Sequence, residues 1–554
     1  MYLTHLSRRI CAMHAPFNLV VYNFWFYEAI LIPIWIAFSL RPAMLVRFFG
    51  VSGERGLYFI VTIIAFLAIR LQAFAIDGPL NPDEAQMAAQ AIKATVDLWP
   101  WHGFDGATGG PLDSDFLALP ALLGLPISFV STRILAAVLE LLTSLALFVA
   151  FRNVYGEVVA RLALIAPLTF FIFTTEPNFV HYSSEHLPVF LIAVAIAGLT
   201  VCFTRERHTS IGAAVAGICL VLALFAKLQA APEAAYVFAI ACLLFVRERG
   251  RRTLRARAAF PFAIGAIATA VMFVAATAVT GSLRDAAVSY LFNNVKYMQS
   301  GSSFSAASYF SLASPTQSIF SGVVPLLLVM TVIVAALAPK RNDWLAIGAT
   351  FGMIAAAIFA INAAGHNFQH YLFLAILPIA VAIAVLLGTL VHRRGLNFAM
   401  AAFLPAVVAI VVLPSFWSRS IRGDVVAYTP SHGPVAAALS QMVAPRSRIS
   451  VWGWMPEYYV YTQTVMATRD ATTTNLIVEG PNQAFYRARY MREFEAAPPE
   501  IFVEAVGPGS FAFHSRKTEG FETFPLLRWY IGAHYRFAGE VAGVRLYRHL
   551  SRPL

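Results

Sequence analysis

The apolar stretch YFIVTIIAFLAIRLQAFAI at positions 58–76 is followed, after a short gap, by NPDEAQ at positions 81–86. The first stretch is long enough to cross a bilayer, which takes about 20 predominantly apolar residues. Pro82 suits the first position of a helix, and Asp83 and Glu84 would then lie in its first turn. A pair of carboxylates beside a membrane is costly and usually has a function. The alternative is a surface helix whose acidic residues only stabilise its start.

The composition of the chain is that of a membrane protein. Hydrophobic residues make up 59% and charged residues 12% of its 554 positions, and the mean hydropathy is +0.69. Soluble domains carry roughly 25% charged residues. The net charge of +11 comes from short basic clusters between apolar runs, which is typical of membrane loops and disfavours nucleic-acid binding. The cysteines have no metal-ligand spacing, and a disulfide framework is not expected.

The apolar runs predict a polytopic α-helical protein with about 11–12 transmembrane helices. The expected spans lie near 57–76, 132–151, 158–175, 186–204, 210–226, 232–246, 258–280, 319–338, 343–362, 370–391 and 397–414. Residues 19–40 either cross the membrane or lie in its interface, so residues 1–56 are treated as a separate N-terminal segment.

Lysine and arginine are distributed unequally between the loops. The basic loops carry Arg41, Arg47, Arg55, Arg152, Arg161, Arg205, Arg207, Arg247, Arg249, Arg251, Arg252, Arg255, Arg257, Lys340, Arg341, Arg393 and Arg394. The positive-inside rule assigns these loops to the cytoplasm. The opposite, outer side receives the long polar insertions, of which the first is the loop 77–131. A transporter would instead distribute polar residues through the middle of the membrane, often with internal repeats.

The composition changes in the last part of the chain. Strands are expected at 448–453, 500–504 and 541–547, and a helix at 482–494. Strands that alternate with helices predict a small α/β domain. We therefore expect a transmembrane domain at 57–415 and an α/β domain outside the cytoplasm at 416–554. The α/β domain is interpreted as a lid or scaffold because it lacks a glycine-rich phosphate motif.

Two outer turns carry most of the remaining candidate groups. Glu176-Pro-Asn-Phe-Val-His181-Tyr-Ser-Ser-Glu185 joins two predicted spans. Glu185 begins the second of these spans, so its side chain is expected to face the outer cavity. The alternatives are a solvated turn residue for Glu176 and a partner of the helix dipole for Glu185.

Gly365-His366-Asn-Phe-Gln-His370-Tyr371 places two histidines four positions apart. That spacing suits a metal on a helix, but the glutamate of the zinc-peptidase motif is missing, and the pattern alone favours a polar surface turn. Lys227 stands at the outer end of a span with no basic neighbour. It either extends to the interface or binds a lipid-linked phosphate as a point charge.

Taken in order, these elements resemble the bacterial membrane glycosyltransferases of the GT-C fold, close to the protein mannosyltransferase and aminoarabinose transferase group. The resemblance covers about residues 57–391. The elements that carry it are Asp83-Glu84, Gly110-Pro111-Leu112, Glu185, Lys227 and His370-Tyr371-Leu372-Phe373. Relatives often have Asp where this chain has Glu185, which leaves the subfamily and the acceptor open.

The resemblance implies a polyprenyl-phosphate-sugar donor and transfer to a hydroxyl of a glycan, glycolipid or protein acceptor. The site would face the periplasm from the bacterial inner membrane. Asp83 would take the hydroxyl proton while the oxygen attacks and inverts the anomeric carbon, and Glu84 would orient Asp83 or the acceptor. Lys227, and in some members a divalent metal (Mg, Mn or Zn), would stabilise the leaving phosphate. The residues implied to line the cavity as metal ligands or hydroxyl binders are Glu176, His181, Glu185, His366, His370 and Tyr371.

Two other classes of function are compatible with the sequence. A transporter or flippase of a lipid-linked substrate would need charged residues in mid-span, and Arg70 and Glu140 fit that description. A non-catalytic subunit in cell-envelope assembly would use its outer domain alone.

Overall fold

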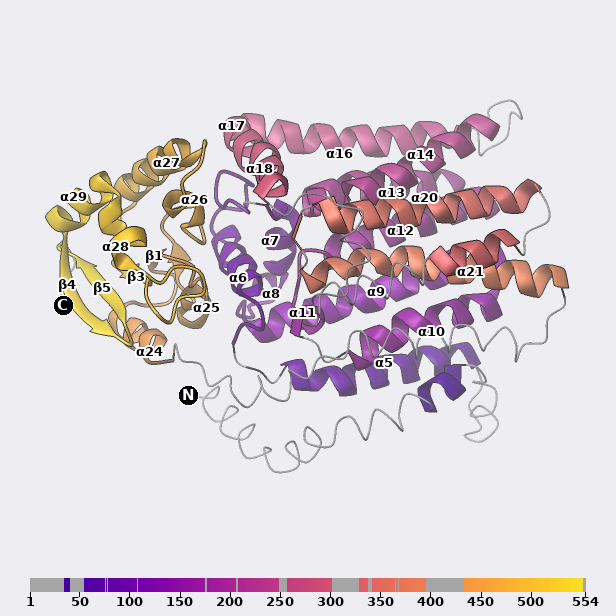
Figure 1. Cartoon of the computed structure of the whole chain (residues 1–554), viewed down its shortest axis with the longest axis horizontal. Coiled ribbons are helices and arrows are strands. Elements are labelled where there is room, and N and C mark those ends of the chain that lie inside the picture. Colours follow the sequence, from indigo (N-terminus) through magenta and orange to yellow (C-terminus); the bar gives the residue numbers. More distant parts are fainter. Residues whose placement is uncertain are drawn as a thin grey trace.

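The structure is a computed structural model of the chain. It describes residues 34–39, 54–74, 76, 78–106, 108–174, 177–205, 208–248, 257–300, 328–336, 341–363, 365–366, 368–394 and 433–551. Within these ranges the protein consists of a helical bundle, a layer of short helices at one end of it, and an α/β domain beyond that layer (Figure 1).

The bundle is built from long apolar helices that lie side by side (Figure 1). They are α5 (Glu54–Phe74), α9 (Phe129–Tyr155), α10 (Glu157–Phe173), α12 (His186–Thr204), α13 (Thr209–Ala226), α14 (Ala231–Glu248), α16 (Ala259–Val279), α20 (Arg341–Ala363) and α21 (Ile376–Arg394). Among the described residues, 7 helical stretches are long and apolar enough to span a membrane. The predicted polytopic helical class is confirmed.

The observed helices match the predicted spans closely wherever the chain is described. Residues 328–336, within the expected span 319–338, are helical. The expected span 397–414, and all of 19–40 except residues 34–39, lie outside the described residues.

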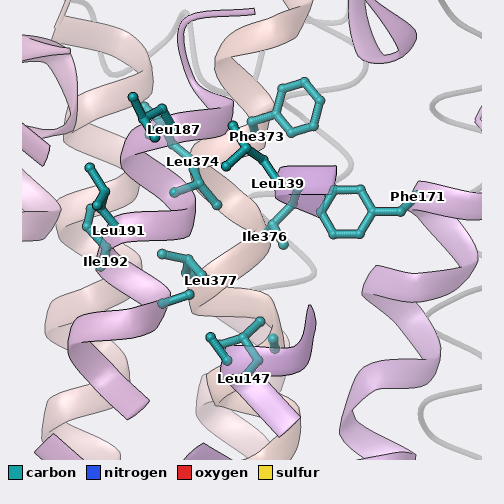
Figure 2. Packing of buried hydrophobic residues seen from close by; sticks show 14 of the residues in the cluster. Leu139, Leu147, Phe171, Leu187, Leu191, Ile192, Phe373, Leu374, Ile376 and Leu377 are labelled. Atoms are coloured by element: carbon teal, nitrogen blue, oxygen red, sulfur yellow. The ribbon is translucent and has the colours of Figure 1, made fainter. Parts of the chain in front are cut away.

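The bundle core is made of large aliphatic and aromatic side chains from several helices. Figure 2 shows Leu139, Leu187, Leu374 and Leu377 packed together, and each of them is buried. Helices α12 and α13 approach especially closely at Gly198 and Gly212. A Cβ on Gly198 would lie 2.6 Å from the Gly212 carbonyl oxygen, so only glycine allows this contact.

A layer of short elements separates the bundle from the α/β domain (Figure 1). It contains α6 (Pro82–Ala94), α7 (Pro111–Leu117) and α8 (Leu119–Leu122) from the loop 77–131. The short helices α11 (Pro177–Val180), η1 (Leu228–Ala230) and η5 (Gln369–Ala375) connect the long ones. After α16 the chain continues through α17 (Leu283–Ala286), the π-helical turn η3 (Ala287–Phe292) and α18 (Asn293–Ser300).

The C-terminal domain (residues 433–551) contains a five-stranded sheet with the order β2-β1-β3-β5-β4. Its strands are β1 (Arg448–Trp452), β2 (Val465–Met466), β3 (Ile501–Glu504), β4 (Tyr535–Val541) and β5 (Val544–His549). The parallel β1–β3 pair lies at the centre, and β5 joins it antiparallel. The helices are α24 (Gly433–Met442), α25 (Glu457–Thr462), α26 (Thr474–Ile477), α27 (Gln483–Ala496), α28 (Arg516–Glu519) and α29 (Pro525–His534). The predicted α/β class of this domain is confirmed.

One predicted strand of this domain is wrong in its extent. The segment expected as a single strand at 541–547 is the end of a hairpin, in which β4 stops at Val541 and β5 starts at Val544. The turn residues Ala542 and Gly543 both have positive φ, 48° and 78°. Two-residue hairpin turns require such angles, and the sequence pattern did not reveal that an alanine would adopt one.

Candidate active site

Asp83 and Glu84 begin α6, but their side chains have different surroundings. The Asn81 side chain caps the helix by accepting a hydrogen bond from the Asp83 N–H at 2.9 Å, with Pro82 at the start of the helix. The local sequence therefore forms the helix start that was predicted. Asp83 is partly exposed, and no described residue forms a hydrogen bond with its carboxylate. This carboxylate is free to accept a proton from a bound molecule.

Glu84 is fully buried and paired with Arg133 on α9. Its Oε1 accepts from the Arg133 Nε at 2.9 Å, and its Oε2 accepts from Nη2 at 2.9 Å. The Leu80 N–H and the Thr132 hydroxyl also donate to Glu84. A bidentate pair of this kind fixes geometry as well as charge. Glu84 thus anchors the start of α6 to the bundle, immediately beside the free carboxylate of Asp83.

Lys227 follows α13 and is held by the turn that precedes α12. Its Nζ donates to the Ser184 hydroxyl at 2.7 Å and to Glu185 Oε1, and it lies 5.0 Å from the centre of the Tyr371 ring. A lysine ammonium has three N–H donors, so one remains for a ligand. Lys227 is buried, which rules out an extended conformation toward the interface.

Two histidines lie next to this lysine and carboxylate. His370 Nε2 lies 4.0 Å from Glu185 Oε1, and the His181 and His370 rings are 6.3 Å apart. His181 Nδ1 donates to the Pro177 carbonyl at 2.7 Å. Burial lowers the pKa of His181 to about 4, so its ring is neutral and its buried Nε2 is a free acceptor. The structure thus brings together His181, Glu185, Lys227, His370 and Tyr371, all five of them predicted from the sequence.

A chain of amides joins the three turns that surround the site. Asn81 Nδ2 donates to Asn178 Oδ1 at 3.1 Å, and Asn178 Nδ2 donates to Gln369 Oε1 at 3.0 Å. These residues come from the first loop, α11 and η5. This connection fixes the position of Asp83 relative to the turns that carry Glu185 and His370.

Tyr297 and Asp113 belong to the same cluster, and no sequence motif distinguishes Tyr297. The Tyr297 hydroxyl lies 3.2 Å from that of Tyr371, and its ring centre lies 4.4 Å from that of His366. The Tyr182 hydroxyl donates to Asp113 Oδ1 at 2.7 Å, while the buried Asp113 Oδ2 has no partner. Asp113 directly follows the Gly110-Pro111-Leu112 element, whereas Tyr297, in the segment 283–300, gives no local signal, so only the tertiary structure reveals Tyr297.

The electrostatic environment connects these groups. Protein surrounds the Asp83 carboxyl closely enough that burial raises its pKa, the charge of Lys227 opposes that rise, and Glu185 adds to it. Burial raises the pKa of Asp113 well above its usual value, against the hydrogen bond from Tyr182 and the charge of Lys227. Asp83 and Asp113 therefore each lie within electrostatic reach of Lys227 and Glu185.

The remaining candidate residues lie at the edge of this cluster, deeper in the bundle, or outside the described residues. Glu176 is not among the described residues. His366 is half-buried and contacts Tyr297, and its buried Nε2 has no hydrogen-bond partner. His186 lies deeper, with Nε2 at 3.2 Å from Glu140 Oε1.

The divalent metal that the resemblance implies for some members finds no ready site among the described side chains. Within the described ranges no three His, Cys, Asp or Glu side chains converge closely enough to hold one ion. The Glu84 oxygens are engaged by Arg133, and Glu185 shares Oε1 with Lys227. We derive no step of the reaction through a metal.

The mid-span charges are paired with each other. Arg70 Nη2 donates to both carboxylate oxygens of Glu140, at 2.9 and 2.8 Å. The same guanidinium donates to the Phe171 and Phe179 carbonyls. Both side chains are buried and fully engaged. The sequence feature that favoured a transporter is thus an internal tie between α5, α9 and α10.

Comparison with known proteins shows similarity in structure only. No family model matches the chain, and no curated protein matches its sequence. The crystal structure of ArnT from Cupriavidus metallidurans in the apo state matches with a TM-score of 0.55 at 14% identity, covering 89% of this chain and 98% of ArnT. The structure of the same protein bound to undecaprenyl phosphate matches with a TM-score of 0.55 at 12% identity, covering 90% and 98%.

The chain has the GT-C fold. The match to ArnT extends over the bundle and the C-terminal domain together, since it covers nearly the whole of both chains. The fold predicted from the short sequence elements is therefore confirmed. At this level of identity the comparison establishes the fold and leaves the chemistry to the site.

Proposed function

We propose that this protein is a membrane glycosyltransferase that moves a sugar from a polyprenyl-phosphate carrier to a hydroxyl of a glycan, glycolipid or protein. The observation that carries the proposal is the juxtaposition of Asp83 and Lys227. The amide chain from Asn81 to Gln369 connects the helix start that carries Asp83 to the turn of Tyr371, and the Lys227 ammonium, with one unused donor, lies over the Tyr371 ring. Hydroxyl activation and phosphate departure require these two groups on opposite sides of one sugar.

In the proposed reaction the acceptor hydroxyl loses its proton to Asp83 as its oxygen bonds to the anomeric carbon. The bond between that carbon and the phosphate oxygen breaks, and the bonding electrons leave with the polyprenyl phosphate. Attack from the face opposite the phosphate inverts the anomeric configuration. Lys227 donates its remaining N–H to the departing phosphate, a charge-assisted contact that is strong where water is excluded.

The other residues of the cluster position these two groups. Glu84 anchors the start of α6 to α9 through Arg133, which fixes the position of Asp83 relative to the bundle. Glu185 and Ser184 orient the ammonium of Lys227. His181, His370 and Tyr371 carry polar atoms that can bind sugar hydroxyls. The GT-C fold and the match to an ArnT structure bound to undecaprenyl phosphate support a lipid-phosphate donor.

We further propose that the site faces the periplasm from the bacterial inner membrane. Helices α9, α12 and α14 end in segments that carry Arg152, Arg205 and Arg247. The C-terminal domain and the short-helix layer lie at one end of the bundle (Figure 1). Helix α16 ends at the same end of the bundle, where α17 follows it. The start of α16, and the C-terminus of α14 that precedes it, therefore lie at the opposite face. The positive-inside rule places that opposite face in the cytoplasm.

Substitution of Asp83 by asparagine tests the proposal. Asparagine retains the shape of the side chain but removes the proton acceptor, and general-base catalysis contributes about 10²–10⁴-fold to a rate. Sugar transfer from a polyprenyl-phosphate donor should fall by that factor at matched folded concentration. The same Asp→Asn change at Asp97, whose carboxylate pairs with the exposed His102 in the first loop, is the control. Near-wild-type transfer by Asp83→Asn would contradict the proposed function.

A further inference from the structure

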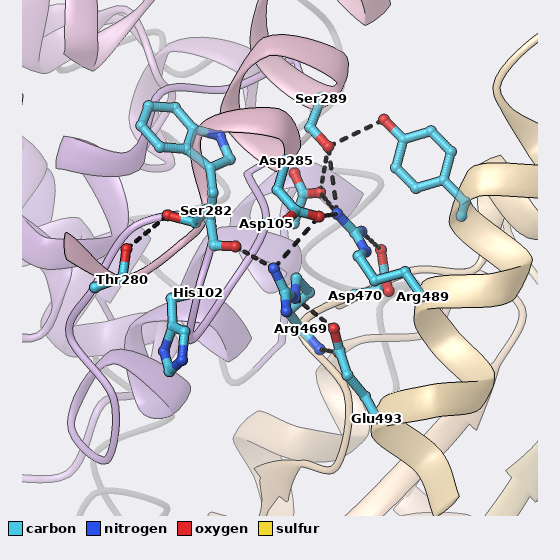
Figure 3. A network of polar contacts seen from close by, with 12 residues as sticks. His102, Asp105, Thr280, Ser282, Asp285, Ser289, Arg469, Asp470, Arg489 and Glu493 are labelled. Carbon is cyan, nitrogen blue, oxygen red and sulfur yellow. Dashed lines mark hydrogen bonds and ion pairs between the residues drawn. The ribbon is translucent and has the colours of Figure 1, made fainter. Parts of the chain in front are cut away.

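A buried arginine of the C-terminal domain connects two outer loops of the bundle (Figure 3). Arg489 lies on α27 and is 1% exposed. Its Nη1 lies 2.7 Å from Asp105 Oδ2 in the first loop and 3.2 Å from Asp285 Oδ1 on α17, and its Nη2 lies 2.6 Å from Asp470 Oδ1. One guanidinium thus holds three carboxylates from three separate segments.

A second arginine extends the same contact. Arg469 Nε lies 2.6 Å from Glu493 Oε1, and Nη1 lies 3.5 Å from Asp285 Oδ1. Arg469 also donates from Nη1 to the Trp101 carbonyl, and its own carbonyl accepts from the Asp105 N–H at 2.9 Å. Backbone and side chains therefore join the C-terminal domain to the first loop as one unit.

The first loop also contacts the helix that carries Asp83, and so links that helix to Arg489. Gln90 on α6 donates from Nε2 to the Asp105 carbonyl at 2.8 Å. Lys93, one turn further along α6, donates to the Met466 carbonyl of β2 at 2.9 Å. Helix α6 thus lies between the bundle, to which Glu84 anchors it, and the C-terminal domain, which fixes its other end.

The segment 283–300, which follows α16, connects Arg489 to Tyr297. Ser289 donates to Asp105 Oδ2 at 2.6 Å, beside Asp285 and Arg489. Ser289 lies in the π-helical turn η3, and Tyr290 of the same turn donates to the Leu224 carbonyl at 2.5 Å. Helix α18 then brings the Tyr297 hydroxyl to 3.2 Å from Tyr371 in the candidate active site. π-Helical turns occur frequently at functional sites.

We infer that Arg489 is a positioning residue for the transfer, through which the C-terminal domain sets the placement of Asp83 and Tyr297. This inference rests on the proposed function. The physical reason is that α6 and the 283–300 segment are short and would each move independently if no shared contact held them. A displacement of about 1 Å at a reacting group can lower a rate about 10²-fold.

Arg489→Lys is the variant that tests the inference. Lysine retains the charge but cannot present a planar fork to three carboxylates. The matched control is Arg487→Lys, on the same helix, because Arg487 contacts only the Leu476 carbonyl and the Phe524 ring of its own domain in the described structure. Both variants are compared with the full-length protein at matched folded concentration.

Two readouts separate positioning from general stability. Amide hydrogen exchange in 82–94 and 293–300 should increase in Arg489→Lys and stay unchanged in Arg487→Lys. The value of kcat should fall roughly 10- to 100-fold, with a smaller change in the donor KM. In the Asp83→Asn background the Arg489→Lys change should lower kcat little further, because the effects of residues that act through one another are not additive.

Ser289→Ala serves as a second variant if Arg489→Lys does not fold, since it loosens the same contact without leaving a buried charge unpaired. Unchanged exchange in α6 and α18, or an equal fall in kcat in both backgrounds, would overturn the inference while the proposed function stands. Near-wild-type transfer by Asp83→Asn would instead overturn the proposed function and the inference with it.

Discussion

Two clusters of buried charge in this protein differ in whether their hydrogen-bonding groups are satisfied. In the bundle, Arg70 and Glu140 engage each other, two backbone carbonyls and His186. At the end of the bundle the candidate active site keeps unpartnered buried atoms on Glu185, His181 and His370. Buried polar groups without partners are costly. The closed cluster joins helices, whereas the open one keeps polar atoms available for a ligand.

Neighbours in sequence show the same contrast. Glu84 is saturated by Arg133, while the adjacent Asp83 has a free carboxylate. The difference arises because the side chains of consecutive residues on a helix point about 100° apart. Glu84 therefore faces α9, and Asp83 does not. Chemical identity alone would not have separated them.

The largest effect that tests this comparison is expected from the closed cluster. Arg70→Met should leave Glu140 as an uncompensated buried charge and lower the free energy of unfolding by about 3–5 kcal/mol. Transfer activity per folded molecule should be retained. Chemical denaturation in detergent, followed by tryptophan fluorescence, measures the first quantity. The double variant Arg70→Met/Glu140→Gln removes both charges and should recover most of the stability; no recovery would contradict the pairing.

The next effect concerns the open cluster. Lys227→Met removes a charge-assisted contact worth about 1.5–3 kcal/mol, so the donor KM should rise roughly 10- to 150-fold while the acceptor KM changes little. Steady-state kinetics with varied donor checks this. Because Lys227 also pairs with Glu185, the double variant Lys227→Met/Glu185→Gln is the control. Restored donor affinity in the double variant would reduce Lys227 to a structural partner of Glu185.

The smallest effect is expected at the contact between the C-terminal domain and the first loop, where hydrogen bonding is only partly satisfied. Asp470 contacts Arg489, yet its buried Oδ2 has no partner. Burial raises the pKa of Asp470 to about 7, the charge of Arg489 opposes that rise, and Asp105 and Glu493 add to it. The folded protein therefore binds the proton more tightly than the unfolded chain, and this contribution to stability is lost as the pH rises through about 7.

Between pH 6 and pH 8 the loss from Asp470 should be about 1 kcal/mol in the free energy of unfolding. Asp470→Asn should flatten the pH dependence of stability over this range, as measured by denaturation of the wild type and the variant at both values. An equal change in the free energy of unfolding between pH 6 and pH 8 in the two proteins would show that the Asp470 carboxylate is as fully paired as that of Glu140.

The amino-acid sequence by itself determined the membrane class, the positions of most described helices and the α/β character of the C-terminal domain. Apolar runs, loop charges and strand patterns are local properties, and bilayer thickness and backbone geometry convert them directly into elements. It also determined Asp83, Lys227, Glu185 and the histidine turn as candidates, because charged groups at the ends of membrane spans are conspicuous.

Only the tertiary structure decided which of these groups are engaged and which are free. It paired Glu84 with Arg133 and Arg70 with Glu140, it joined Asp113 to Tyr182, and it brought Tyr297 to the site from a segment that carries no motif. It also divided the predicted 541–547 strand by a turn with two positive φ angles. Pairing depends on distances between segments far apart in the chain, and a sequence pattern contains no information about those distances.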